Sequence, residues 1–174
     1  MTKGRRRSSE RPIGNKRQPM IRQLFKIVNK TISVVNGASP SSGYGSAEAF
    51  RLPEGNILIH GAVGYITLTT SDADITATFD GDISIGTGST SDGTLSNAEV
   101  NLVASTALGA ATAKVSPNVR LVTSTSTTGV IHDNTAADVV FYFNLLIDDA
   151  AISGAADFTA NGYVEVLYTV LGDD

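Results

Sequence analysis

Apolar and other side chains alternate along several short segments of the chain, and this period of two predicts β-strands. The longest such run is ADVVFYFNLLID, residues 137–148. One face of this strand would carry Val139, Phe141, Phe143, Leu145 and Ile147, and the other face Val140, Tyr142, Asn144 and Leu146. Both faces are largely apolar, which indicates a central strand or a strand whose outer face is covered by a partner.

Further strand candidates follow one another at a spacing of about ten residues, separated by Gly, Asp, Ser and Asn turns. They are residues 57–63, 65–70, 75–79, 83–85, 98–106, 118–124, 128–133 and 157–172. Gly64 is expected to form a bulge or bend, and Asp80 with Gly81 a hairpin turn. This pattern favours an all-β fold, an antiparallel β-sandwich that is jelly-roll-like. The side chains expected to be mainly buried, in the core or at a subunit contact, are Phe79, Val139, Phe141, Phe143, Leu145 and Val166. No helical pattern alternates with the strands, so a parallel α/β sheet is not expected.

The N-terminal part of the chain differs from the rest. Residues 1–20 are charged, contain Pro and Gly and show no periodicity, so we expect them to be disordered on their own. Residues 20–28 fit either an amphipathic helix or a strand; we favour a helix or irregular structure there and a strand over 30–35. The expected organisation is a basic N-terminal arm over 1–38, extended or partly helical, a turn-rich linker over 39–49 and a β-sandwich domain over 50–174.

Positive charge is concentrated in the same N-terminal part. Residues 1–30 contain ten Lys and Arg and a single acid, Glu10, whereas the rest of the chain contains three Lys and Arg and 16 acids. The net charge of −4 therefore conceals an arm of +9 attached to a body of −13. Such asymmetry is typical of a tail that meets an acidic partner, which could be nucleic acid, a membrane surface or an acidic protein.

Composition excludes several classes of site. The chain has no Cys, so disulfides and thiolate metal ligands are excluded. No run of 18 apolar residues occurs, so no transmembrane helix is expected, and the N-terminus lacks the apolar segment of a secretory signal. A mitochondrial presequence is disfavoured because Pro12 and Pro19 would interrupt the amphipathic helix that it requires.

Catalytic chemistry has few candidates. His60 is expected to be a hydrogen-bonded strand residue, whereas His132, beside Asp133, would be either a general base or an ordinary surface histidine in a turn. Ser and Thr are so abundant that a match to a catalytic triad is uninformative, and no GxSxG motif strengthens it. We therefore expect a protein that is not an enzyme.

Three pairs of neighbouring acids indicate either calcium-binding loops or ordinary hairpin turns. The pairs are Asp72 with Asp74, Asp80 with Asp82, and Asp148 with Asp149. None belongs to a calcium loop of the EF-hand type with its terminal Glu. The residues leave calcium binding open, although we expect no cofactor and no metal.

Three phrases of the body resemble a known family. They are LPEGNILIHGAV, ITATFDGDISIGT and the C-terminal FNLLIDDAAISGAADFTANGYVEVLYTVLGDD. Together, over residues 52–174, they resemble the capsid decoration, or cement, proteins of tailed bacteriophages. The resemblance implies a β-sandwich on the outer surface of the virion that clamps neighbouring major capsid proteins, without enzymatic activity or cofactor. It also implies self-association as a homotrimer, because such proteins tend to sit on threefold positions of heads.

The arm has no counterpart in this resemblance. We interpret it as a strap that docks on an acidic surface of the major capsid protein, and expect neither nucleic acid nor a membrane as its partner. The residues expected to dock are the cations Arg5, Arg6, Arg7, Arg11, Lys16, Arg17 and Arg22 and an apolar plug of Leu24, Phe25, Ile27 and Val28. Guanidinium groups pair with carboxylates in a bidentate geometry, which suits this use.

Two other functions fit parts of the sequence. A single-jelly-roll viral coat protein would use a basic arm to bind the packaged nucleic acid, but the body is poor in aromatic residues and Pro and contains the phage-like phrases. A carbohydrate-binding β-sandwich would need an aromatic platform, and the chain has no Trp.

Overall fold

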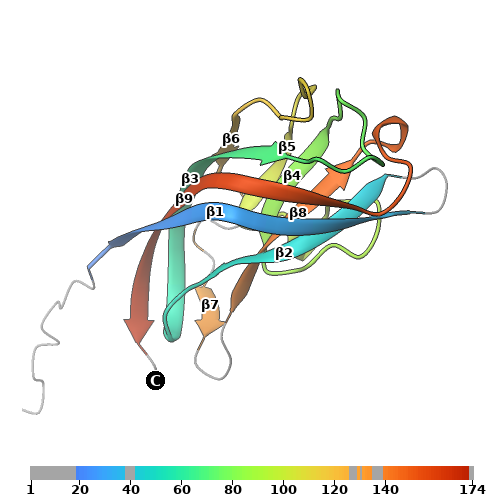
Figure 1. Ribbon diagram of the computed structural model, residues 1–174. Helices are drawn as coiled ribbons and strands as arrows, with labels where there is room; N and C mark the ends of the chain where they lie inside the picture. The colour runs from blue at the N-terminus through green and yellow to red at the C-terminus, as the bar shows by residue number, and fades with distance from the viewer. Residues whose placement is uncertain (1–18, 38–41, 126–128, 130, 135–138, 173–174) are drawn as a thin grey trace, which may run out of the picture.

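The computed structural model describes residues 19–37, 42–125, 129, 131–134 and 139–172. Strands dominate these residues, and the only helical elements among them are the 3-10 turns η1 (Asn97–Glu99) and η2 (Asp149–Ala151) (Figure 1). The strands are β1 (Ile21–Asn36), β2 (Gly43–Arg51), β3 (Gly55–Thr69), β4 (Gly81–Gly86), β5 (Val103–Ala107), β6 (Val119–Val122), β7 (Ile131–Asn134), β8 (Val140–Ile147) and β9 (Ala156–Gly172). The expectation of an all-β chain is confirmed.

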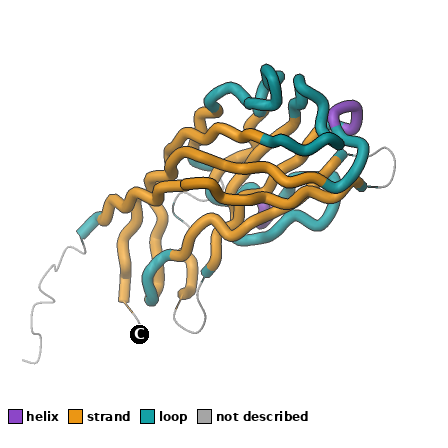
Figure 2. The backbone as a smooth tube through the Cα atoms, in the orientation of Figure 1, coloured by secondary structure: helices purple, strands orange, loops and turns teal. Residues whose placement is uncertain are grey.

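The strands form one antiparallel sheet that is nearly closed on itself. Its order is β5-β4-β8-β2-β1-β9-β3-β6, and β7 pairs with the beginning of β3. The two ends of this order meet where Val103 bridges to Thr123 and the Ser124 amide donates to the Leu102 carbonyl at 2.8 Å. Long strands run side by side through most of the molecule (Figure 2).

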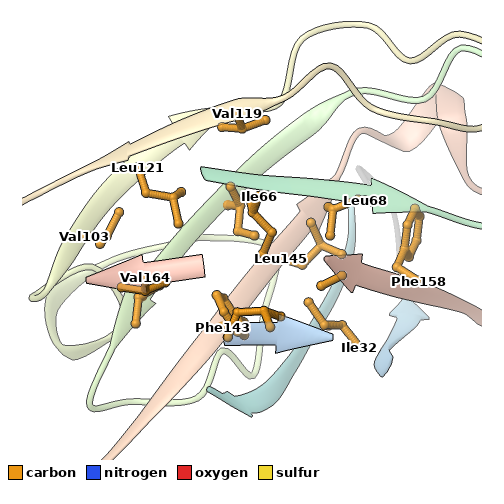
Figure 3. Close-up of a cluster of buried hydrophobic side chains, with 14 of the residues drawn as sticks. Ile32, Ile66, Leu68, Val103, Val119, Leu121, Phe143, Leu145, Phe158 and Val164 are labelled. Atoms are coloured by element: carbon orange, nitrogen blue, oxygen red, sulfur yellow. The ribbon is translucent and has the colours of Figure 1, made fainter. Parts of the chain in front are cut away.

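Side chains from nearly every strand fill this interior (Figure 3). Phe79, Phe141, Phe143, Leu145 and Val166 are fully buried, as the alternation predicts, and Val139 is partly buried against them. The β8 strand lies between β2 and β4, so its predicted central position is confirmed. Burial of the large apolar side chains in this interior provides the main stabilisation of the fold.

The outer face of β8 is covered at its middle by the same chain. The Asn144 side-chain amide donates to the carbonyls of Gly88, at 2.9 Å, and Glu99, at 3.0 Å, and its oxygen accepts the Thr90 amide proton at 2.8 Å. Asn144 is completely buried by these contacts. A partner is therefore not required to cover this part of the strand.

The helix favoured over residues 20–28 is wrong, because these residues belong to β1. From Ile21 to Ile27 the strand pairs with β9 residue by residue, and a bulge between Ile27 and Lys30 shifts the register before pairing resumes. Asn29 takes a positive φ of 48° in this bulge. The bulge interrupts the alternation of the sequence, which explains why a strand could not be distinguished from a helix there.

The sheet also includes most of the segment expected to be a linker. Residues 43–51 form β2, which pairs with β8 along nearly its whole length. Gly45 is required at the contact between β2 and β1, because a Cβ at that position would lie 2.0 Å from the Ser33 carbonyl oxygen. The sheet therefore begins at Ile21 rather than at residue 50.

Two predicted local features are also wrong. Residues 75–79 are not a strand and form no hairpin with β4, because their backbone bonds to two separate segments: the Thr76 amide donates to Ala151 and the Ala77 carbonyl accepts from Lys114. Gly64 continues the regular pairing of β3, without a bulge. It is required because a Cβ there would lie 2.3 Å from the Tyr163 carbonyl oxygen.

Candidate docking surface

The predicted docking residues fall into three groups. Arg5, Arg6, Arg7, Arg11, Lys16 and Arg17 lie outside the described residues. Arg22, Leu24 and Val28 are exposed on β1, whereas Phe25 and Ile27 point into the molecule. Phe25 stacks on Phe50 with 4.1 Å between ring centroids, and Ile27 is 5% exposed. The apolar plug is therefore split, because successive residues of a strand face opposite sides.

The exposed residues of β1 border an open groove of about 450 Å³, which we name the basic groove. Its lining residues are Arg22, Leu24, Lys26, Val28, Gly162, Tyr163 and Glu165. Arg22 forms an ion pair with Glu165 at 2.5 Å, whereas Lys26 pairs with no described residue, so the groove retains a positive charge. Leu24 and Val28 expose 51% and 71% of their surface beside it.

Exposed apolar residues continue from the basic groove across β3 to β6. The register places Val63 of β3 level with Glu165 on one side and with Val122 of β6 on the other. Tyr65 lies level with Tyr163, and their rings meet edge-on with 6.0 Å between centroids. Contiguous exposed apolar side chains of this kind mark interaction surfaces.

The same outer face of β1 and β9 carries a second groove near the other end of the two strands. This acidic groove, of about 230 Å³, is lined by Ser33, Val34, Val35, Asp72, Ala155, Ala156 and Asp157. Asp157 lies opposite Ser33 in the pairing of the two strands. The Asp157 carboxylate has no hydrogen bond or ion pair with the described part of the chain, and exposed Val35 lies beside it.

The acids proposed as calcium ligands behave as turn residues or as a repulsive cluster. Asp72 accepts the Asp74 amide proton at 3.1 Å, and Asp74 accepts the Ser153 hydroxyl proton at 2.9 Å. Burial raises the pKa of Asp148, and the nearby charges of Asp80 and Asp82 raise it further. Within the described residues, no group of three or more His, Asp or Glu is placed to hold a metal ion.

Replacing Asp148 by Asn is expected to raise the melting temperature at pH 7. A carboxyl group whose pKa is raised on folding destabilises the native state when it is charged, and this penalty disappears as the pH falls below the unfolded pKa of about 4. The difference between Asp148→Asn and the wild type should therefore be largest at neutral pH and vanish near pH 3. Glu54→Gln, which removes the same charge from an exposed position, is the control for thermal melts across pH. Equal effects of the two variants would contradict the prediction.

Both histidines lie on strands of the sheet. His132 lies in β7 rather than in a turn; its ring is half-buried and packs edge-on against Phe141 with 5.8 Å between centroids. Its Nε2 has no hydrogen-bond partner, and burial lowers its pKa. Asp133, the next residue of the strand, faces the opposite side. His60 is hydrogen-bonded as expected, with its Nε2 2.9 Å from the Thr169 hydroxyl oxygen.

Comparison with known proteins adds no relative. No protein-family model matches the chain, and no curated protein or solved structure matches it either. The described residues contain no helix that is long and apolar enough to cross a membrane. Function is therefore inferred from the arrangement of charge and exposed apolar surface.

Proposed function

We propose that the protein is a structural virion component that binds the outer surface of a bacteriophage capsid and cements neighbouring major capsid proteins. The observation that supports this best is the continuity between the arm and the sheet. Residues 1–18, with seven Lys and Arg and one Glu, lead into β1, whose first outward side chains line the basic groove. A cationic segment thus continues directly into an exposed apolar face.

The arm and the groove have complementary physical roles in this proposal. An extended segment of 18 residues spans at most about 60 Å, which is long enough to follow a path between capsid subunits. Exposed ion pairs contribute only about 0–1 kcal/mol each and weaken with salt. The side chains exposed next to the groove, Val63, Tyr65 and Val122, supply the part of the affinity that salt does not screen.

We also propose that the nearly closed sheet is a jelly-roll-like sandwich and that the protein forms a homotrimer. The two-layer architecture is supported by the limited pairing of β1 with β2, at Val35 and Asn36 only. This narrow connection separates the half containing β9, β3 and β6 from the half containing β2, β8, β4 and β5. Self-association is supported by the apolar residues exposed on the first half.

A chain that begins at Met20 tests the docking strap. It should retain the melting temperature of the full chain, because β1 begins at Ile21, and it should bind heads that lack the protein at least about tenfold more weakly, as expected when several charge pairs are lost. A matched variant keeps the length of the arm and replaces Arg5, Arg6, Arg7, Arg11, Lys16 and Arg17 by Gln. Cosedimentation with heads measures the affinity at several salt concentrations.

Three outcomes distinguish the candidate functions. Equal binding of the truncated and full chains to heads would exclude a docking role for the arm. Weak binding of both arm variants with a flatter salt dependence would support it. Tight binding of free DNA by the full chain, with a steep salt dependence and assembly of shells without heads, would instead identify a coat protein that packages nucleic acid.

A further inference from the structure

Two grooves of opposite charge lie on one face of the same pair of strands. The basic groove surrounds Lys26, which pairs with Tyr163 in the register, and the acidic groove surrounds Asp157, which pairs with Ser33. Lys26 and Ser33 are seven positions apart along β1, roughly 20 Å at the rise of a strand. The outer face of β1 and β9 therefore carries opposite charges at its two ends, positive around Lys26 and negative around Asp157.

The key charges of the two grooves have no partner within the described chain. Lys26 and Asp157 are both exposed, and neither forms an ion pair or hydrogen bond through its side chain with a described residue. Each also has apolar neighbours on the same surface, Leu24 and Val28 beside Lys26 and Val35 beside Asp157. The two grooves thus offer complementary charge, and both combine it with exposed apolar area.

We propose that the basic groove of one copy binds the acidic groove of a second copy of this chain. A second copy of this chain carries both complementary surfaces. Residues 19–174 contain six Lys and Arg against 16 acids, so two bodies repel each other in most orientations. An orientation that places the basic groove of one copy against the acidic groove of the other replaces this repulsion by attraction.

Contact between two different patches is heterologous, and such contacts close into a ring when the rotation between copies allows it. A closed ring of three copies would be the homotrimer proposed above. An exposed ion pair contributes little affinity by itself, so the pairing of Lys26 with Asp157 mainly sets the orientation, and the apolar side chains at both grooves supply most of the attraction. The contact does not depend on a capsid and is testable on the isolated full chain.

Reversal of the two charges tests the contact by sedimentation equilibrium at micromolar concentration. The wild type should be oligomeric, and Lys26→Glu and Asp157→Lys should each weaken association at least tenfold, because each places like charges opposite each other. The double variant, Lys26→Glu with Asp157→Lys, should recover association to within about threefold of the wild type, since the exchanged charges attract again. Glu54→Lys, which makes the same charge change as Asp157→Lys at an exposed position outside both grooves, should associate as the wild type does.

Three results would contradict the proposal that the two grooves bind each other. A wild-type chain that remains monomeric at 100 times the working concentration would overturn the proposal, as would a double variant that associates no better than the single ones. If the single variants leave self-association unchanged and weaken only binding to heads, the face binds the shell protein instead of a second copy. Circular dichroism and thermal melts of each variant separate loss of contact from loss of folding.

Discussion

Replacement of Phe141 by Ala is expected to lower the free energy of unfolding by about 3–5 kcal/mol. Phe141 has no exposed surface and lies in the middle of an aromatic ladder. Its ring packs on Phe50 at 5.2 Å between centroids and on His132 at 5.8 Å, and Phe50 in turn stacks on Phe25. The substitution removes contacts from β8, β2 and β7 together, and the surrounding backbone is too constrained by pairing to close the cavity.

Urea denaturation followed by circular dichroism measures this loss. Tyr65→Ala is the matched control, because it removes an aromatic ring of similar size from a strand position that is 39% exposed, and it should cost about 1 kcal/mol or less. A cost below about 1.5 kcal/mol for Phe141→Ala would show that this site collapses or that its ring is not part of the core. The m-value should stay unchanged if only stability is altered.

Removal of residues 1–38, leaving a chain that begins at Ser39, is expected to abolish folding. The deletion removes β1, which pairs with β9 along most of its length and with β2 at its end. It also removes the buried side chains of Ile27, Ile32 and Val34. Each contributes about 1.5–3 kcal/mol when fully buried, and the lost strand pairing comes in addition. Their sum approaches the total stability of about 5–15 kcal/mol typical of a domain.

The chain that begins at Met20 is the control, because it keeps β1 complete. Far-ultraviolet circular dichroism and a thermal melt compare the two truncated chains with the full one. The shorter chain should show no cooperative transition, whereas the chain from Met20 should melt as the full chain does. A cooperative melt of the chain from Ser39 at the wild-type temperature would mean that β1 is dispensable. For this reason, tests of the arm must end their deletion before Ile21.

The sequence alone was enough to predict the all-β class and the most strongly buried positions. In β8 and β9, alternation of large β-branched and aromatic residues is sustained over many positions, so both the strands and their inward faces could be predicted. Phe79 was also correctly assigned to the core, although the strand predicted around it does not exist. Hydrophobicity was sufficient for that residue, because Phe is among the residue types most often buried.

Where the local pattern is weak or interrupted, the secondary structure of a segment depends on the strands that lie beside it. β1 contains a bulge at Asn29. β2 has few large apolar residues, and its Gly45 approaches the Ser33 carbonyl closely. Neither feature has a local signature, since both depend on which strand lies alongside. Pairing with β9 and β8 therefore overrode the preference for a helix in one case and for a linker in the other.

The candidate surface shows the same division. The concentration of cations in the arm could be predicted from the sequence. The split of the apolar plug, with Leu24 and Val28 outward and Phe25 and Ile27 inward, could not, because a helix was favoured there. The sequence could not predict that Tyr163, Val63 and Tyr65 lie beside the outward residues of β1. It also could not predict that Asp157 lies on the same face as Lys26. A sequence specifies which side chains a strand presents to each side, but their neighbours on that side are set by the register between strands. That register exists only once the sheet has formed.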